Sequence, residues 1–223
     1  MFCYKYVRKA VVVMLLSLTA FLILSCGNGK TTKEAMKYAC VGIYTEGGYG
    51  SGVIIDINSE EIVILSNLHV LSDWNEKGYV VFANGARAFG QTFGADEGRD
   101  LSFLSIPVKD VLEEYGSEVI KELRAASLSD NLPEEFDFYT FSLFEDKKEI
   151  EGKIENTDTF FYELDRNMML GKANHITEGM SGCPVFDKEN RLCGIICAGS
   201  EDGTVAAISA KEIERAYKEA KVF

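Results

Sequence analysis

The sequence predicts an all-β fold in which two β-rich halves flank an amphipathic helix. Short apolar, β-branched runs alternate with turns rich in glycine and asparagine, which is typical of antiparallel strands. Between the halves, residues 108–123 place apolar side chains three or four positions apart among charged ones, which predicts a helix. A second helical pattern over residues 211–222 closes the chain.

The first 25 residues have the pattern of an export signal. Lys5, Arg8 and Lys9 form a basic start, and residues 10–24 form an apolar run of 15 residues. A membrane-spanning helix needs about 20 apolar residues, so this run is short for an anchor and suits a secretory signal. Its removal leaves 198 residues, enough for one domain or two small fused halves.

The signal ends in Ile-Leu-Ser-Cys at residues 23–26, which resembles the bacterial lipobox. In signals of that kind the cysteine is lipidated and becomes the mature N-terminus. We therefore expect a lipid on Cys26, a polar tether over residues 26–38, and a location on the periplasmic or cell-surface face of a bacterial membrane. The alternative is an ordinary signal peptide that is cut nearby, with Cys26 incidental.

Charge argues against a nucleic-acid partner. The formal net charge is −12, and removal of residues 1–25, which carry three basic and no acidic side chains, changes it to −15. Phosphate backbones are bound by Lys and Arg, so a protein this acidic is disfavoured as their partner.

The cysteines of the folded part give no metal-binding spacing and no cofactor motif. Four cysteines remain after residue 26: Cys40, Cys183, Cys193 and Cys197. We expect them to be small buried apolar residues, with a disulfide such as Cys183–Cys193 left open.

Six strands are expected before the helix, over residues 40–44, 52–57, 62–66, 79–82, 86–93 and 101–106. Six short strands in about 70 residues predict a small antiparallel barrel. Six more are expected after the helix, over residues 136–144, 149–155, 159–164, 183–186, 192–198 and 204–208. The expected domain plan is an N-terminal barrel at 39–107, a helical linker at 108–126, and a C-terminal barrel with its terminal helix at 127–223.

Three polar residues stand in the order required for nucleophilic acyl transfer. His69 follows an apolar strand, Asp100 precedes one, and Ser181 lies in the tetrad Gly-Met-Ser-Gly at residues 179–182. Acyl transfer needs a hydroxyl, an imidazole to take its proton, a carboxylate to orient the imidazole, and N–H groups aimed at the oxyanion. The glycines permit the unusual backbone that turns N–H groups inward, so the N–H groups of Gly179 and Ser181 are the oxyanion-hole candidates.

Longer motifs around these residues carry a family resemblance. They are Gly-Ser-Gly-Val-Ile-Ile at 50–55, Ser-Asn-Leu-His-Val at 66–70, Asp-Leu-Ser-Phe-Leu at 100–104 and Gly-Met-Ser-Gly-Cys-Pro at 179–184. Together they resemble the trypsin-like serine peptidases, particularly the bacterial HtrA-like and glutamyl-endopeptidase branches. The likeness runs from about residue 39 to the final helix.

The resemblance implies a chymotrypsin-like double antiparallel β-barrel with the site between the barrels. His69 is then the general acid and base, Asp100 its orienting partner and Ser181 the nucleophile, with no cofactor and no metal. Met180 and Cys183 depart from the family pattern and alter the wall of the cleft.

The resemblance also implies a specificity pocket with His175 at its base, Ile196 on its wall, and Cys197 to Gly199 along the substrate edge. Ile196 stands where glutamyl endopeptidases carry a histidine, and no acid occupies the pocket base. Neither an acidic nor a basic substrate preference is therefore supported.

The expected function is that of an exported, membrane-anchored serine endopeptidase, which acts on proteins or peptides through an acyl-enzyme. Two alternatives remain open from the residues. One is a protease-fold binding lipoprotein that has lost turnover through a malformed oxyanion loop, and the other is an esterase-like hydrolase on the same triad.

Overall fold

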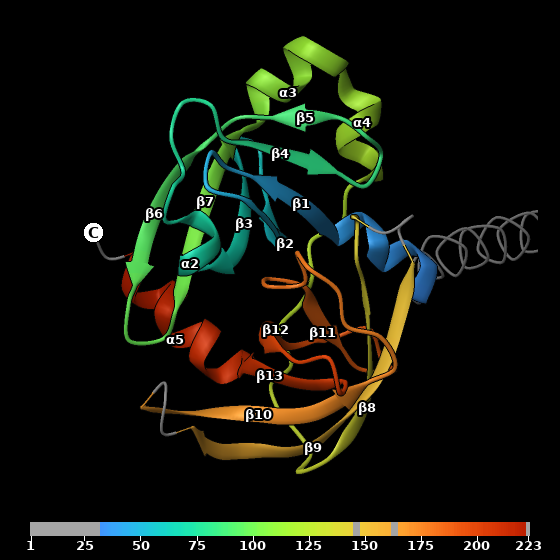
Figure 1. The fold of residues 1–223 in the computed structure, drawn as a ribbon. Coiled ribbons are helices and arrows are strands. Elements are labelled where there is room, and N and C mark those ends of the chain that lie inside the picture. Colours follow the sequence, from blue (N-terminus) through green and yellow to red (C-terminus); the bar gives the residue numbers. More distant parts are fainter. Residues whose placement is uncertain (1–31, 145–147, 162–164, 222–223) are drawn as a thin grey trace, which may run out of the picture. The chain divides into compact units, whose positions relative to one another are not determined.

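The protein is described by a computed structural model that covers residues 32–144, 148–161 and 165–221 (Figure 1). It consists of a seven-stranded antiparallel sheet followed by a closed six-stranded antiparallel barrel, with a few helices. The predicted all-β fold with two barrel-like halves is confirmed. The predicted signal peptide, Cys26 and the start of the tether lie outside the described residues.

The first sheet contains β1 (Cys40–Tyr44), β2 (Tyr49–Ile57), β3 (Glu61–Asn67), β4 (Tyr79–Phe82), β5 (Arg87–Ala88), β6 (Gln91–Asp96) and β7 (Leu101–Pro107). Their order across the sheet is β5-β4-β1-β2-β3-β7-β6. The two edge strands, β5 and β6, are consecutive in the chain and separated only by Phe89 and Gly90. The sheet must therefore curl back on itself, although no hydrogen-bonded ladder joins its two described edges.

The second half contains β8 (Phe136–Phe141), β9 (Glu149–Phe161), β10 (Arg166–Ala173), β11 (Pro184–Phe186), β12 (Leu192–Gly199) and β13 (Thr204–Ser209). These strands close into a barrel in the order β10-β13-β12-β11-β8-β9. Its interior is filled by apolar side chains that include Ile154, Met169 and Val185.

The helices are η1 (Lys33–Ala39, a 3-10 helix), α2 (Leu68–Leu71), α3 (Val108–Tyr115), α4 (Ser117–Glu122) and α5 (Ala210–Ala220). Helix α5 packs against β6 and β7 of the sheet and against β12 and β13 of the barrel. One cluster of buried side chains runs across both halves, with Val53 and Leu101 from the sheet and Ile195 and Ile208 from the barrel.

Several predicted elements differ from the observed ones. The strand expected over residues 86–93 is split into β5, which pairs with β4, and β6, which pairs with β7 at the other edge of the sheet. Gly90, between them, lies so close to β7 that a Cβ there would be 2.3 Å from the Ser105 carbonyl oxygen. The helix expected over 108–123 is broken into α3 and α4 at Gly116, whose φ of 79° cannot continue a right-handed helix.

In the second half, the two strands expected over 149–155 and 159–164 form one long strand, β9, as far as its described end at Phe161. Strand β10 was not predicted, because its mixture of polar and apolar residues lacks a clear alternation. Residues expected in the tether form η1 instead, which buries Met36 and Ala39 in the core shared by the two halves.

Candidate active site

Antiparallel pairing of β3 with β7 brings His69 and Asp100 together. Asn67, the last residue of β3, is the Cα partner of Leu101, the first residue of β7. The short helix α2 begins directly after Asn67, and the Leu68 N–H donates to the Asp100 carbonyl oxygen over 3.0 Å. Two residues 31 positions apart in sequence thus become neighbours through the register of one strand pair.

The Asp100 carboxylate contacts His69 with both oxygens. Oδ2 lies 2.8 Å from Nδ1 of the imidazole, and Oδ1 accepts the backbone N–H of His69 over 2.9 Å. A proton on Nδ1 satisfies the first contact and leaves Nε2 unprotonated, the form needed in a base. Asp100 adopts a φ of 55°, a left-handed conformation that aspartate tolerates better than most residues.

Cys197 supplies a further contact to the same carboxylate. Its Sγ lies 3.2 Å from Oδ2 of Asp100, as donor. Burial by itself would raise the pKa of Asp100, but the hydrogen bonds from His69 and the thiol outweigh it and hold that pKa below its usual value. Burial and the adjacent carboxylate raise the pKa of the Cys197 thiol to about 12, so the thiol stays protonated and can keep donating.

The loop that carries Ser181 is shaped by two glycines and held by β2. Gly179 and Gly182 have φ values of 82° and 87°, and a Cβ on Gly182 would lie 1.8 Å from the Ser51 carbonyl oxygen. Ser51 in turn donates its N–H to the Ser181 carbonyl and its hydroxyl to the Gly179 carbonyl, both over 2.7 Å. The loop of the barrel is therefore fixed by hydrogen bonds from the first sheet.

The N–H groups of Gly179 and Ser181 find no hydrogen-bond acceptor among residues 32–144, 148–161 and 165–221. Such groups are available to a ligand oxygen. The same turn leaves the Ser181 hydroxyl donating to the Cys197 carbonyl oxygen over 3.3 Å, and within the described part of the chain it has no hydrogen bond to His69. Rotation about the Ser181 side-chain bond would redirect the hydroxyl.

A cavity of about 150 Å³ lies beside Ser181. Of the predicted pocket residues, Ile196 and Gly199 line it and His175 and Cys197 do not. His175 is exposed, and the Cys197 side chain faces Asp100. The expected placement of His175 at the pocket base is therefore not observed.

Nδ1 of His69, a carboxylate oxygen of Asp100 and Sγ of Cys197 lie within 4.8 Å of one another, and within the described part of the chain they are the group that could hold a metal ion. The hydrogen bonds among them already account for their closeness.

A family model for the trypsin-like peptidase domain matches residues 50–195, which include all of these groups except Ile196, Cys197 and Gly199. The chain belongs to the trypsin-like peptidase family. By class it is a serine peptidase, which is a hydrolase. A comparison with curated protein sequences finds no match.

Solved structures share the fold at low sequence identity. The Rv3671c protein of M. tuberculosis in an inactive form has a TM-score of 0.66 and 13% identity, covering 87% of this chain and 92% of its own. The serine endoprotease from Yersinia pestis has a TM-score of 0.64 and 21% identity, covering 84% and 64%. The HtrA-type protease AlgW with tripeptide has a TM-score of 0.67 and 22% identity, covering 83% and 61%. This chain thus spans less than two thirds of the last two proteins, and the likeness shows the fold alone.

Two residues that shape the site were not expected from the sequence in these roles. Ser51 belongs to the Gly-Ser-Gly motif of the sequence, and its contact with the loop that carries Ser181 spans 128 positions. Cys197 was expected on the substrate edge, and its contacts with Asp100 and Ser181 depend on the packing of the two halves. No sequence pattern signals either contact.

Proposed function

We propose that the chain is an exported serine endopeptidase in which Ser181 is the nucleophile, His69 the general acid and base, and Asp100 its orienting partner. The observation that carries the proposal is the double contact of one carboxylate with the imidazole and the backbone N–H of His69. That contact fixes both the tautomer and the direction of the ring.

The reaction follows from these roles. Oγ of Ser181 attacks the substrate carbonyl carbon while Nε2 of His69 takes the hydroxyl proton, and Asp100 stabilises the imidazolium that forms. The N–H groups of Gly179 and Ser181 donate to the oxyanion. The imidazolium then returns its proton to the leaving amine, and water releases the acyl group from Ser181 by the same steps.

The test is labelling with a fluorophosphonate probe, which reacts with activated serines. The wild-type chain should be labelled and should cleave a peptide library, and Ser181→Ala should lose both while keeping its circular dichroism spectrum and melting temperature. Loss of a triad serine lowers turnover by about 10⁴ to 10⁶-fold. Labelling or hydrolysis that persists in Ser181→Ala would overturn the assignment.

A second candidate, a binding protein that has lost turnover, is favoured by one observation. The Ser181 hydroxyl donates to the Cys197 carbonyl instead of His69. A folded wild-type chain that binds peptides but neither reacts with the probe nor cleaves would support this function. An esterase would be recognised by turnover of simple esters without cleavage of any peptide in the library.

The proposal includes export and lipid attachment at Cys26, which rests on the sequence of residues 1–26. Within the described residues, no helix has the length and apolar character needed to cross a bilayer. A single acyl chain binds membranes weakly, whereas the diacylglycerol of bacterial lipoproteins anchors stably.

Cys26→Ala should move the protein from the membrane fraction to the soluble fraction or block its processing, without changing its specific activity. The measurement is intact mass of the processed protein together with fractionation. A processed protein without a lipid mass, or a Cys26→Ala variant that stays on the membrane, would contradict lipid anchoring but leave the peptidase assignment standing.

A further inference from the structure

A second cavity of about 810 Å³ lies where α5 begins, and it shares no lining residue with the cavity beside Ser181. Its walls come from the turn before β7, the segment before β8, strands β9 and β10, the end of β13, and the first turns of α5. Four basic and four acidic side chains line it. In a chain of net charge −12, this is a locally balanced surface.

Arg166 is the feature of this cavity that points to a ligand. Its Nε and Nη1 atoms are buried, and among the described residues they have no hydrogen-bond partner and the side chain makes no ion pair. A guanidinium stays charged at every physiological pH, and buried polar atoms in folded proteins nearly always have partners. Each of the two carboxylate-binding forks of the guanidinium contains one of these atoms, so neither fork is occupied.

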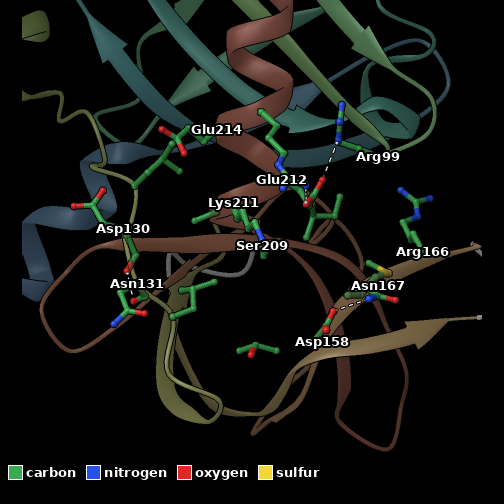
Figure 2. A pocket seen from close by; sticks show the side chains of 18 of the residues that line it. Arg99, Asp130, Asn131, Asp158, Arg166, Asn167, Ser209, Lys211, Glu212 and Glu214 are labelled. Carbon is green, nitrogen blue, oxygen red and sulfur yellow. Dashed lines mark hydrogen bonds and ion pairs between the residues drawn. The ribbon is translucent and has the colours of Figure 1, made fainter.

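The acids nearest in the cavity wall already have partners. Glu212 is bound by Arg99 and Arg215, and Asp158 accepts a hydrogen bond from Asn167 over 2.6 Å. Glu214 pairs with Lys218 on the outer turn of α5. Figure 2 shows the Asp158–Asn167 contact beside Arg166, with Asp130 and Asn131 on the opposite side of the cavity.

We propose that this cavity binds a peptide through a carboxylate that is held by Arg166. A planar carboxylate matches the guanidinium fork with two parallel hydrogen bonds. The acids in the wall disfavour a dianionic phosphate, whereas Asp130 and the Asn131 amide can accept N–H groups of a peptide that extends across the cavity. Lys211, which has no ion pair among the described residues, adds a second cation to the wall.

This cavity lies next to Asp100 and is therefore a neighbour of the candidate active site. Gly98 and Arg99 line the cavity and immediately precede Asp100 in the chain. The positive charge of Arg166 also reaches the Cys197 thiol, whose pKa it lowers in opposition to burial and Asp100. A bound carboxylate therefore lies close to the groups that hold the catalytic imidazole.

The test measures binding on full-length Ser181→Ala protein, so that its failure says nothing about hydrolysis. The probes are fluorescent tetrapeptides: one with a glutamate and an amidated C-terminus, its glutamine counterpart, and one with no acidic side chain and a free C-terminal carboxylate. Anisotropy gives Kd for each. Arg166→Gln should weaken binding of the carboxylate peptides by about tenfold or more. Arg87→Gln, an exposed position outside the cavity, is the matched control and should leave Kd unchanged.

The two carboxylate peptides distinguish a side chain from a C-terminus as the natural source, and binding of either supports the proposal. Equal affinity for the glutamine peptide, an unchanged Kd in Arg166→Gln, or competition by inorganic phosphate but not by acetate would overturn it. Removal of an unpaired buried charge should not lower the melting temperature. Should Arg166→Gln fail to fold, Arg166→Lys, which keeps the charge but loses the fork, must still bind the carboxylate peptides more weakly than the parent.

Discussion

The two halves of the site are held in place by different means. On the side of the first sheet, the Asp100 carboxylate holds both the ring and the backbone N–H of His69 by hydrogen bonds. The two residues lie next to the paired ends of β3 and β7. On the barrel side, Ser181 is fixed through its backbone, by two glycines of positive φ and by Ser51 of β2. His69 is therefore oriented by its own half, whereas the loop that carries Ser181 is held by the other half.

Because of this difference, the alignment of Ser181 depends on the contacts between the sheet and the barrel, which we call the junction. Ser51 reaches from the sheet to the loop, and Cys197 reaches from the barrel to Asp100 and Ser181. Of the three proposed catalytic side chains, the hydroxyl of Ser181 is the one that makes no hydrogen bond to its proposed partner, His69, among the described residues. Substitutions on the sheet side should act on the chemistry of the base, and those at the junction should act on the alignment of the nucleophile.

Asp100→Asn should have the largest effect after loss of Ser181 itself. An amide at this position favours the wrong tautomer of His69, so kcat should fall by about 10⁴-fold with little change in KM. Steady-state kinetics on a cleaved peptide measure the effect. Asp96→Asn is the control, because Asp96 pairs with Arg99 and makes no described contact with His69. A fully active Asp100→Asn together with an inactive Asp96→Asn would transfer the role to Asp96.

Ser51→Ala should have a smaller effect, through the loop that forms the proposed oxyanion hole. Loss of the hydroxyl removes the bond to the Gly179 carbonyl but retains the backbone bond to Ser181. Because complete loss of an oxyanion donor lowers kcat by about 10² to 10³-fold, we expect a loss of about tenfold here. Ser105→Ala, at the far end of β7, is the control and should leave kcat unchanged. If Ser51→Ala also keeps the full kcat, the prediction is wrong, and Gly179 and Gly182 alone define the loop that carries Ser181.

The parts of the candidate site that can be predicted from the sequence are those whose residues stand in local motifs. His69 after a strand, Asp100 before one and Ser181 between glycines are recognisable because each stands next to a strand end or turn. The contacts of the junction could not be predicted from local motifs, because Ser51 and Cys197 act through contacts that form only when the sheet and the barrel pack together. Strand β10 and Arg166 were missed for a related reason: a mixed polar pattern gives no period, and burial of a guanidinium depends on tertiary structure.

The thiols should give the mildest effect, a loss of stability at alkaline pH. The four cysteines of the described residues, Cys40, Cys183, Cys193 and Cys197, are buried and form no disulfide with one another. Burial raises the pKa of the Cys193 and Cys197 thiols to about 12 and that of Cys183 to about 11. Thiols of an unfolded chain ionise near pH 8.5.

Above that pH the unfolded chain has released protons that the native chain still holds, so the free energy of unfolding falls as pH rises. The stabilisation is complete below about pH 8.5 and is lost progressively up to about pH 12, by at most about 1.4 kcal/mol per pH unit for each thiol. Urea unfolding between pH 7 and 10.5 measures how steeply the free energy of unfolding falls with pH. Cys193→Ala should make this slope shallower without changing the contacts of Asp100. An unchanged slope in Cys193→Ala would mean that other groups, such as the lysines of surface ion pairs, determine the alkaline limit.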